Sequence, residues 1–489
     1  MTETHFTRDV LTLVKGTTIS LIITTLASPI ITRLYGPDAF GLVALFTSIT
    51  GILGIIVCLR YEFAIVLPKS DEEAANVFGL CIAIAFIVSI AAIPILIVVQ
   101  QPAVDFLKAP QLGSFFWLIP PVLLISGFFL ALNYWNTRTK QYNRLSIARV
   151  TSSLLTSGTQ ISVGYLGYAS GGVLIYANVL GQFVSTFILG IQIMRDHLVF
   201  FRQNITRKGI AEAFRHYIIF PKFDAGAALI NTISWQVPIF LLSYFFSTMI
   251  VGYYSLGMMM VTLPMTVIGS AISQVFFQRA AMEQHIGSLS LIFENAYSFL
   301  VKISLFPLLL LAFIGQDLFV LIFGPSWGEA GYYIQILSVW AVFLFISSPL
   351  SSILPIVAKQ KIGLVLSILT LITRFISISL GGILGSATLS ILFFSLSGAV
   401  MYGSTSTFFM HLAGVSVQKT VKIFCAHFLV FVPAGVVMSI AKILNFPSVV
   451  QIILAAVVLM VYFIYLLKTD STIRDMFSQF LYVNKDKPA

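Results

Sequence analysis

The sequence predicts an all-α polytopic membrane protein, and its composition, its apolar runs and its charge distribution predict it. Hydrophobic residues make up 58% of the 489 residues and charged residues only 9%, with a mean hydropathy of +0.98. Soluble domains carry roughly 25% charged residues, so a soluble fold is excluded. A spanning helix needs about 20 apolar residues, and about fourteen spans would use nearly all the apolar residues present.

Apolar runs between polar breaks predict fourteen transmembrane helices. They lie near residues 10–33, 40–60, 74–99, 114–136, 147–167, 172–194, 221–244, 249–275, 296–315, 330–357, 362–382, 386–411, 421–441 and 447–467. Because the count is even, both termini are expected on one side of the membrane.

Basic residues predict which side that is. Of the 28 Lys and Arg residues, all but five fall on the segments that share a side with the termini. Three of the five, Arg33, Lys108 and Lys442, lie on the other side, whereas Lys302 and Arg374 lie inside helices. Cytoplasmic loops carry the excess of Lys and Arg, so the termini are expected in the cytoplasm. The net charge of +10 therefore reflects orientation, and no nucleic-acid partner is expected.

A weak internal repeat divides the chain. A shift of 211 residues sets YGPDAFGLVAL over FSTMIVGYYSL, aligns Gly41 with Gly252, and brings Pro29 and Pro238 within two residues of each other. Transporters with a midplane site contain repeats of this kind. The predicted parts are a six-helix bundle in 1–195, a cytoplasmic linker in 196–220, a second six-helix bundle in 221–412, and two additional helices with a cytoplasmic tail in 413–489.

The linker alternates aromatic with basic residues, which suits a stretch lying in the headgroup zone. Its aromatic residues are Phe200, Phe201, Phe214 and Tyr217. A hinge between two bundles and a plain solvated linker both remain open.

Several segments resemble a known family. ITRLYGPDAFGLVALF, RYEFAIVLPKSDEEAANVF, YIIFPKFDAGAALINTISWQVPIFLL and IFGPSWGEAGYYIQIL occur in order at family-like spacing. Together they resemble the polysaccharide transporter (Wzx-type) branch of the multidrug/oligosaccharidyl-lipid/polysaccharide exporter superfamily. The similarity runs through nearly the whole chain.

The resemblance implies a flippase of the bacterial cytoplasmic (inner) membrane. Its cargo would be undecaprenyl-diphosphate-linked oligosaccharide units, moved from the cytoplasmic to the outer leaflet for O-antigen lipopolysaccharide, capsule or similar surface polysaccharides. The lipid bilayer and the polymerase and chain-length machinery of the same pathway would be its partners. No cofactor is expected, but transport is expected to use a proton gradient, a sodium gradient or the membrane potential.

Motifs of catalysis are missing from the sequence. There is no phosphate-binding loop of the Gly-x-x-x-x-Gly-Lys-Ser/Thr type, no His-Glu-x-x-His and no serine elbow, so no enzyme activity is expected. The three cysteines, Cys58, Cys81 and Cys425, show no metal-ligand spacing and are expected to be buried thiols.

Arg374 is the main candidate for contact with cargo. It lies about twelve residues, or roughly 18 Å, into its predicted helix, near the middle of the bilayer core. Polar and small residues share its helical face, which predicts that this face turns away from lipid. They are Ser367, Thr370, Ser377 and Gly381. Arg374 is expected either to meet the diphosphate of the cargo, or to lock the bundle through a buried carboxylate or helix carbonyls.

Two further basic residues are candidates for the cavity. Lys15 continues a polar stripe into the first helix. Whether this stripe faces the cavity is left open by the sequence. Lys302 lies only about 9 Å into its helix, so it either lines the cavity or snorkels to the interface.

One face of the seventh predicted helix carries Asp224, Asn231 and Trp235. This set is expected either to hold sugar hydroxyls against the indole or to form ordinary contacts between helices. Arg60 and Glu62 close the second helix and are candidates for a cytoplasmic gate, with an ordinary surface ion pair as the alternative.

Rival functions follow from the same features. Within the superfamily, a cation-coupled multidrug exporter or a lipid II flippase is the alternative; the two deepest ionisable groups are basic, which favours anionic cargo. From another class, a glycan polymerase or acyltransferase would need a large outward loop or an intramembrane His or Asp constellation, and neither is visible.

Overall fold

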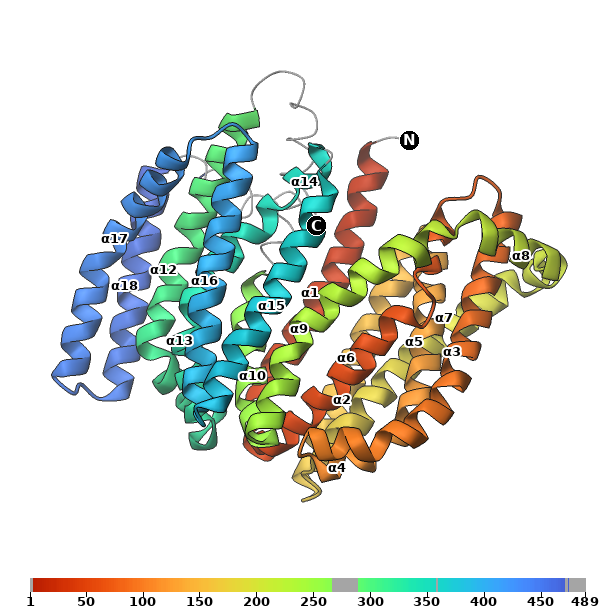
Figure 1. Ribbon diagram of the computed structural model, residues 1–489, viewed down its shortest axis with the longest axis horizontal. Helices are drawn as coiled ribbons and strands as arrows, with labels where there is room; N and C mark the ends of the chain where they lie inside the picture. The colour runs from red at the N-terminus through yellow and green to blue at the C-terminus, as the bar shows by residue number, and fades with distance from the viewer. Residues whose placement is uncertain (1–2, 266–288, 358, 471–473, 475–489) are drawn as a thin grey trace, which may run out of the picture. The chain divides into compact units, whose positions relative to one another are not determined.

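The computed structural model describes residues 3–265, 289–357, 359–470 and 474, with side chains from residue 15 onward (Figure 1). Every regular element in this part of the chain is helical, and none is a strand. Twelve of the described helical segments are long and apolar enough to cross a membrane. The chain is therefore an all-α, multi-pass membrane protein.

The chain forms two compact units. Unit 1 comprises residues 1–260, 322–333 and 359–398. Its long helices are α1 (Glu3–Leu34), α2 (Pro37–Ile56), α3 (Asp71–Phe106), α5 (Ile119–Arg138), α6 (Tyr142–Tyr165), α7 (Gly171–Asn204), α9 (Ala225–Phe245), most of α10 (Thr248–Pro264), α15 (Gln360–Ile383) and the first half of α16 (Ala387–Leu412). Its shorter elements are η1 (Tyr61–Val66), α4 (Pro110–Gly113), η2 (Phe116–Leu118), α8 (Arg207–His216), the π-helical turn η3 (Phe220–Asp224) and η5 (Pro325–Trp327).

Small residues allow the helices of unit 1 to pack closely. α1 packs on α6, α6 on α7, and α9 on α15. Where α2 meets α10, a Cβ on Gly41 would strike the carbonyl oxygen of Thr248, and one on Gly252 would strike that of Pro37. The two glycines that the internal repeat aligns thus face each other, and both must lack a side chain.

Unit 2 comprises residues 261–321, 334–358 and 399–489. Its helices are α12 (Leu289–Phe323), most of α13 (Gly328–Leu350), α14 (Ile353–Ile356), the second half of α16, α17 (Val417–Ile443) and α18 (Ser448–Thr469). Phe306 of α12 joins the last two helices to this unit. Its ring stacks on Tyr462 with centroids 3.9 Å apart and meets Phe431 edge-on at 5.3 Å.

Two predicted helices fall outside the twelve. The predicted helix 147–167 is α6, whose Ser- and Thr-rich face makes it less apolar than the others. The predicted helix 249–275 begins as α10, a shorter apolar helix, and its residues 266–275 lie outside the described residues. The predicted linker 196–220 begins inside α7, which continues to Asn204, and then forms α8.

Two aromatic residues of that linker lie in the protein interior. Phe201 is buried, stacks on Phe78 at 4.9 Å and packs against Trp135 at 4.7 Å. Tyr217 is also buried, and its hydroxyl donates to Glu73 Oε1 at 2.9 Å. α8 itself contacts α3, with Ala213 as its buried residue.

Candidate functional site

Arg374 is buried in unit 1. It lies in the second half of α15 and is 4% exposed. Ser377, Ile378 and Gly381 are buried with it, whereas Phe375 on another face is exposed. A Cβ on Gly381 would strike the backbone of Ser390, so α15 and α16 lie in close contact here. The polar and small face of α15 is thus turned into the protein.

The guanidinium of Arg374 is held by α9 and by aromatic rings. One nitrogen donates to the carbonyl oxygen of Ser234 at 2.7 Å and to its hydroxyl oxygen at 3.2 Å. The guanidinium carbon lies 4.3 Å from the ring centroid of Trp235 and 5.9 Å from that of Phe394. Stacking on an aromatic face stabilises a desolvated guanidinium by about 2 kcal/mol.

Proline explains why this carbonyl needs an outside donor. In an α-helix the carbonyl of Ser234 accepts from the amide four residues later, but that residue is Pro238, which has no N–H. Ser234 is 2% exposed, so water cannot replace the missing bond. Arg374 supplies the donor from α15. The alternative role expected for Arg374, a bond to helix carbonyls, is thus present in the structure.

The three candidates on α9 do not share one environment. Trp235 is half-buried against Arg374, whereas Asn231 is exposed. Asp224, at the start of α9, accepts from Arg60 Nε at 2.8 Å. The sequence set them on one face, but they lie at successive levels along the helix, with Asp224 just before Ala225 and Trp235 about 16 Å further on, so they meet different neighbours.

Arg60 contacts two carboxylates, that of Asp224 and that of Glu62, the other gate candidate. Its guanidinium lies 3.7 Å from Glu62 Oε1, and its carbon lies 4.2 Å from the centroid of Phe63. Leu59 and Arg60 have φ angles of 49° and 66°, a left-handed conformation that is unfavourable for residues other than glycine. This strained turn aims Arg60 at the first turn of α9.

Glu62 is the buried member of this cluster. It is 2% exposed, and its Oε2 has no hydrogen-bond partner among the described residues. Burial raises the pKa of Glu62, while Arg60 opposes that shift and Asp224 adds to it. A carboxylate in such surroundings is easier to protonate than one in water.

The two candidate lysines differ in their surroundings. Lys302 lies in unit 2, and its Nζ is 2.6 Å from Asp470 Oδ2, at the end of α18. The backbone carbonyl of Lys302 also accepts from the hydroxyl of Tyr462 at 2.8 Å. Lys302 thus fastens α18 to α12. Lys15 is exposed at the start of the apolar part of α1.

Arg138 anchors the turn between η1 and α3, a role that sequence reasoning missed. Its guanidinium donates to the carbonyls of Ile65, Pro68 and Ser70, and to Asp71 Oδ1 at 2.8 Å. These bonds fix the turn between η1 and α3. In the sequence Arg138 was one basic residue among many on the cytoplasmic segments, and no local pattern distinguished it.

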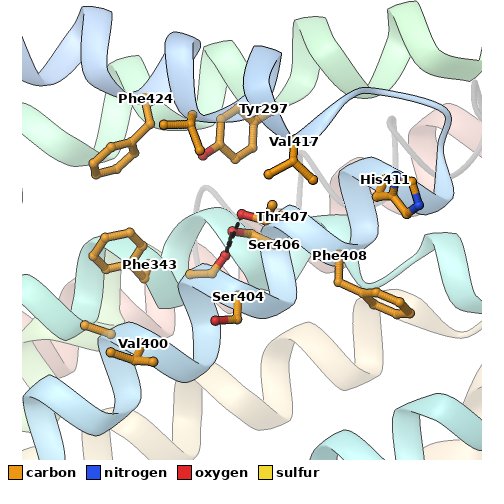
Figure 2. A pocket seen from close by; sticks show the side chains of 13 residues that line it. Tyr297, Phe343, Val400, Ser404, Ser406, Thr407, Phe408, His411, Val417 and Phe424 are labelled. Atoms are coloured by element: carbon orange, nitrogen blue, oxygen red, sulfur yellow. Dashed lines mark hydrogen bonds between the residues drawn. The ribbon is translucent and has the colours of Figure 1, made fainter.

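Unit 2 contains an apolar pocket of about 690 Å³. Figure 2 shows Tyr297, Val417 and Phe424 on one side of it, and Phe343 of α13 with side chains of α16 on the other. Unit 1 contains a smaller chamber of about 300 Å³ between α1, α2, α6, α7 and α10. Hydroxyl and amide side chains line much of this chamber, among them Gln160 and Asn178.

No metal centre is visible in the described part of the chain, which contains no group of three His, Cys, Asp or Glu side chains close enough to share an ion. Cys58 and Cys81 are buried, as expected. The expectation for Cys425 was wrong, because this residue of α17 is exposed.

Comparisons with known proteins agree with these features. Residues 30–331 match a family model described as "Polysaccharide biosynthesis protein". No curated protein sequence matches the chain significantly. Among solved structures, the lipid II flippase MurJ in an inward closed conformation superimposes with a TM-score of 0.70 at 12% identity, over 93% of this chain and 98% of that one.

Multidrug transporters give the same fold. An inward-facing multidrug resistance MATE family transporter of the MOP superfamily matches with a TM-score of 0.65 at 16% identity, over 82% of this chain and 96% of that one. An outward-facing transporter of the same family matches with a TM-score of 0.54 at 14% identity, over 84% of this chain and 96% of that one. The chain thus shares its fold with these proteins, and it belongs to the polysaccharide biosynthesis protein family whose model its sequence matches.

Proposed function

We propose that this chain is a flippase that moves undecaprenyl-diphosphate-linked oligosaccharide units from the cytoplasmic to the outer leaflet by alternating access. Membership of a polysaccharide biosynthesis family, in a chain with a transporter fold, is the observation that carries this proposal. The membrane would be the bacterial inner membrane, and the glycan would serve O-antigen, capsule or a similar surface polymer.

The proposed contact for cargo is the pair formed by Trp235 and Arg374. Arg374 covers one face of the indole, and the half-buried Trp235 can offer its other parts to a sugar ring. The guanidinium behind it supplies a positive field for the diphosphate. Direct forked contact with phosphate would require the bond to Ser234 to open during the transport cycle.

Arg60, Glu62 and Asp224 form the proposed cytoplasmic gate. They connect the segment after α2 with the start of α9, so breaking the Arg60–Asp224 pair would free one from the other. Asn231 and Lys15 stay candidates for the cavity because both are exposed. Lys302 is better assigned to fastening α18, since Asp470 neutralises it.

We also propose fourteen spans, with α6 and the helix that begins with α10 added to the twelve apolar ones. Both termini would then be cytoplasmic, as the positive-inside distribution indicates. The division into two six-helix bundles and two additional helices follows from the repeat in the sequence.

Membrane potential is the simplest driving force. Moving about two negative charges outward across roughly 150 mV gains at most about 7 kcal/mol, at about 2.3 kcal/mol per charge per 100 mV. Coupling to protons or sodium is the competing scheme. Flipping in sealed proteoliposomes that ignores an imposed potential but follows a proton or sodium gradient would exclude the simple electrophoretic scheme.

The test is complementation of a flippase-deficient strain together with flipping of a fluorescent lipid-linked oligosaccharide in proteoliposomes. The wild-type chain should restore surface polysaccharide and move the labelled lipid. A chain that instead moves lipid II or exports cationic dyes, and leaves the oligosaccharide lipid in place, would establish one of the two rival activities of the superfamily. Hydrolysis or polymerisation of the glycan would indicate an enzyme.

A further inference from the structure

A polar pocket of about 530 Å³ lies in unit 1 between the first turn of α3 and α8. The pocket is lined by charged side chains of both signs. Glu73 and Glu212 are acidic, Arg215 is basic, and His216 is a second basic side chain. The function proposed above leaves this pocket without a role.

The inner wall of the pocket is fixed by hydrogen bonds. Asn76 is buried; its amide nitrogen donates to the carbonyl of Asn204 at 2.9 Å, and its oxygen accepts from the amide of Thr206 at 2.9 Å. A Cβ on Gly209 would strike the side chain of Asn76. A glycine here thus lets α8 approach α3, and the pocket is part of the fold.

The pocket is placed at the level of lipid headgroups. α3 has 36 residues, about 54 Å of helix, which exceeds the roughly 30 Å of a hydrocarbon core, so its first turn can extend beyond that core. Next to the pocket, Phe214, Ile218 and Ile219 expose apolar side chains. Charged groups beside exposed apolar ones are typical of the interface between lipid and water.

We propose that this pocket binds the phosphoethanolamine headgroup of a membrane lipid. The phosphate would accept hydrogen bonds from the guanidinium of Arg215, and the ammonium would donate to the carboxylates of Glu73 and Glu212. A choline headgroup has no N–H to donate, and a glycerol headgroup has no positive charge to meet the two carboxylates. The mixed charge of the lining therefore selects among lipids.

The bound lipid would also stabilise the proposed gate. The carbonyl of Phe214 accepts from the hydroxyl of Tyr61 at 2.9 Å, and Tyr61 directly follows Arg60. The hydroxyl of Tyr217, which follows α8, donates to Glu73 in the pocket. Any effect of the lipid on transport depends on the function proposed above, whereas its binding does not.

Native mass spectrometry of the delipidated full-length chain tests the binding directly. Phosphatidylethanolamine, phosphatidylcholine and phosphatidylglycerol with identical acyl chains are added in turn. We expect the ethanolamine lipid to be retained about tenfold more tightly than the choline lipid, equivalent to about 1.4 kcal/mol. Glu212→Gln should abolish this preference, whereas Arg215→Gln should weaken the retention of both lipids because both carry the phosphate.

Two control variants match these in charge and location. Arg207→Gln removes a positive charge from the same helix, and Glu72→Gln removes a negative charge from the same turn of α3; neither side chain lines the pocket. Both controls should keep the preference and the wild-type retention. Equal retention of the ethanolamine and choline lipids, tighter retention of the glycerol lipid, or a Glu72→Gln control that loses the preference as fully as Glu212→Gln would each overturn the proposal. Because no arm of the experiment measures transport, its outcome is independent of the flippase proposal.

Discussion

Proline interrupts α1 and α9 of unit 1 at positions that the internal repeat brings within two residues of each other, and the two interruptions are repaired differently. In α1, Pro29 leaves the carbonyl of Thr25 without its helical donor, and the hydroxyl of Ser28 donates to it at 2.8 Å. In α9, Pro238 leaves the carbonyl of Ser234 in the same condition, and the donor comes from Arg374 on another helix.

The difference indicates that repair alone does not explain Arg374. A serine from the same helix turn satisfies such a carbonyl without placing a charge in the bilayer. At the membrane depth that the sequence predicts for Arg374, an arginine costs at least about 2.5 kcal/mol to insert. The repair of α9 therefore differs from that of α1 in one respect: it brings a positive charge from α15 against the half-buried Trp235. We interpret that charge as the part of Arg374 that serves transport.

The largest expected effect separates the two roles of Arg374. Arg374→Ala should abolish transport and lower thermal stability, because Ser234 then keeps a buried carbonyl without this donor, at about 1–3 kcal/mol. Adding Pro238→Ala restores a backbone N–H at the right position. The double variant should recover its unfolding midpoint in detergent and still fail to flip lipid-linked oligosaccharide in proteoliposomes.

Arg374→Lys is the matched control, since it keeps the charge without the planar fork, and it should retain part of the transport. If the double variant recovers transport together with stability, Arg374 only repairs α9 and the contact with cargo must be sought elsewhere.

The sequence predicted much of this arrangement, but not its partners. The helical class, the burial of Arg374 and the inward face of α15 follow from hydropathy and spacing, which are local properties of the chain. The partner of Arg374 is 140 positions away in the sequence, on a helix whose register no local pattern gives. The position of Pro238 did contain a usable signal, because a proline inside a buried helix always leaves one carbonyl in need of a donor.

The partner of Asp224 was likewise not predictable from local spacing. The sequence grouped Asp224 with Asn231 and Trp235 on one helical face, whereas its ion-pair partner, Arg60, is 164 positions away in the sequence. The turn that presents Arg60 to Asp224 was not predictable either. Leu59 and Arg60 adopt left-handed conformations there, and no glycine, the usual sequence signal of such a turn, stands at these positions.

A second, smaller effect on transport is expected from the Arg60–Asp224 ion pair at the start of α9. Arg60→Gln and Asp224→Asn each remove the ion pair that holds the start of this helix. Because the pair is partly exposed, each should change stability by under about 1 kcal/mol, yet alter transport several-fold if the pair is a gate. The exchange variant, Arg60→Asp with Asp224→Arg, should recover part of the transport. Transport at wild-type rate in both single variants would reduce the pair to a surface contact.

Glu62, which lies beside this ion pair, should make the stability of the protein depend on pH. Because burial raises its folded pKa above the ordinary 4.5, the folded state binds the proton more tightly than the unfolded state does. The stability this contributes is present at acid pH and is lost as the pH rises from about 4.5 through the folded pKa. The unfolding midpoint of Glu62→Gln, followed from pH 4 to pH 8 in detergent, should lack that decrease and exceed the wild-type midpoint at neutral pH. A Glu62→Gln curve parallel to that of the wild type would contradict this.

The smallest expected effect belongs to α1 and completes the comparison. Ser28→Ala removes the donor to the Thr25 carbonyl, which should lower the free energy of unfolding by about 1 kcal/mol and leave transport near the wild-type rate. Pro29→Ala in the Ser28→Ala background supplies the backbone donor and should return the unfolding midpoint to its original value. If Ser28→Ala abolishes transport as fully as Arg374→Ala does, the interrupted helices are equally sensitive to loss of repair. The charge of Arg374 would then have no role beyond satisfying the Ser234 carbonyl.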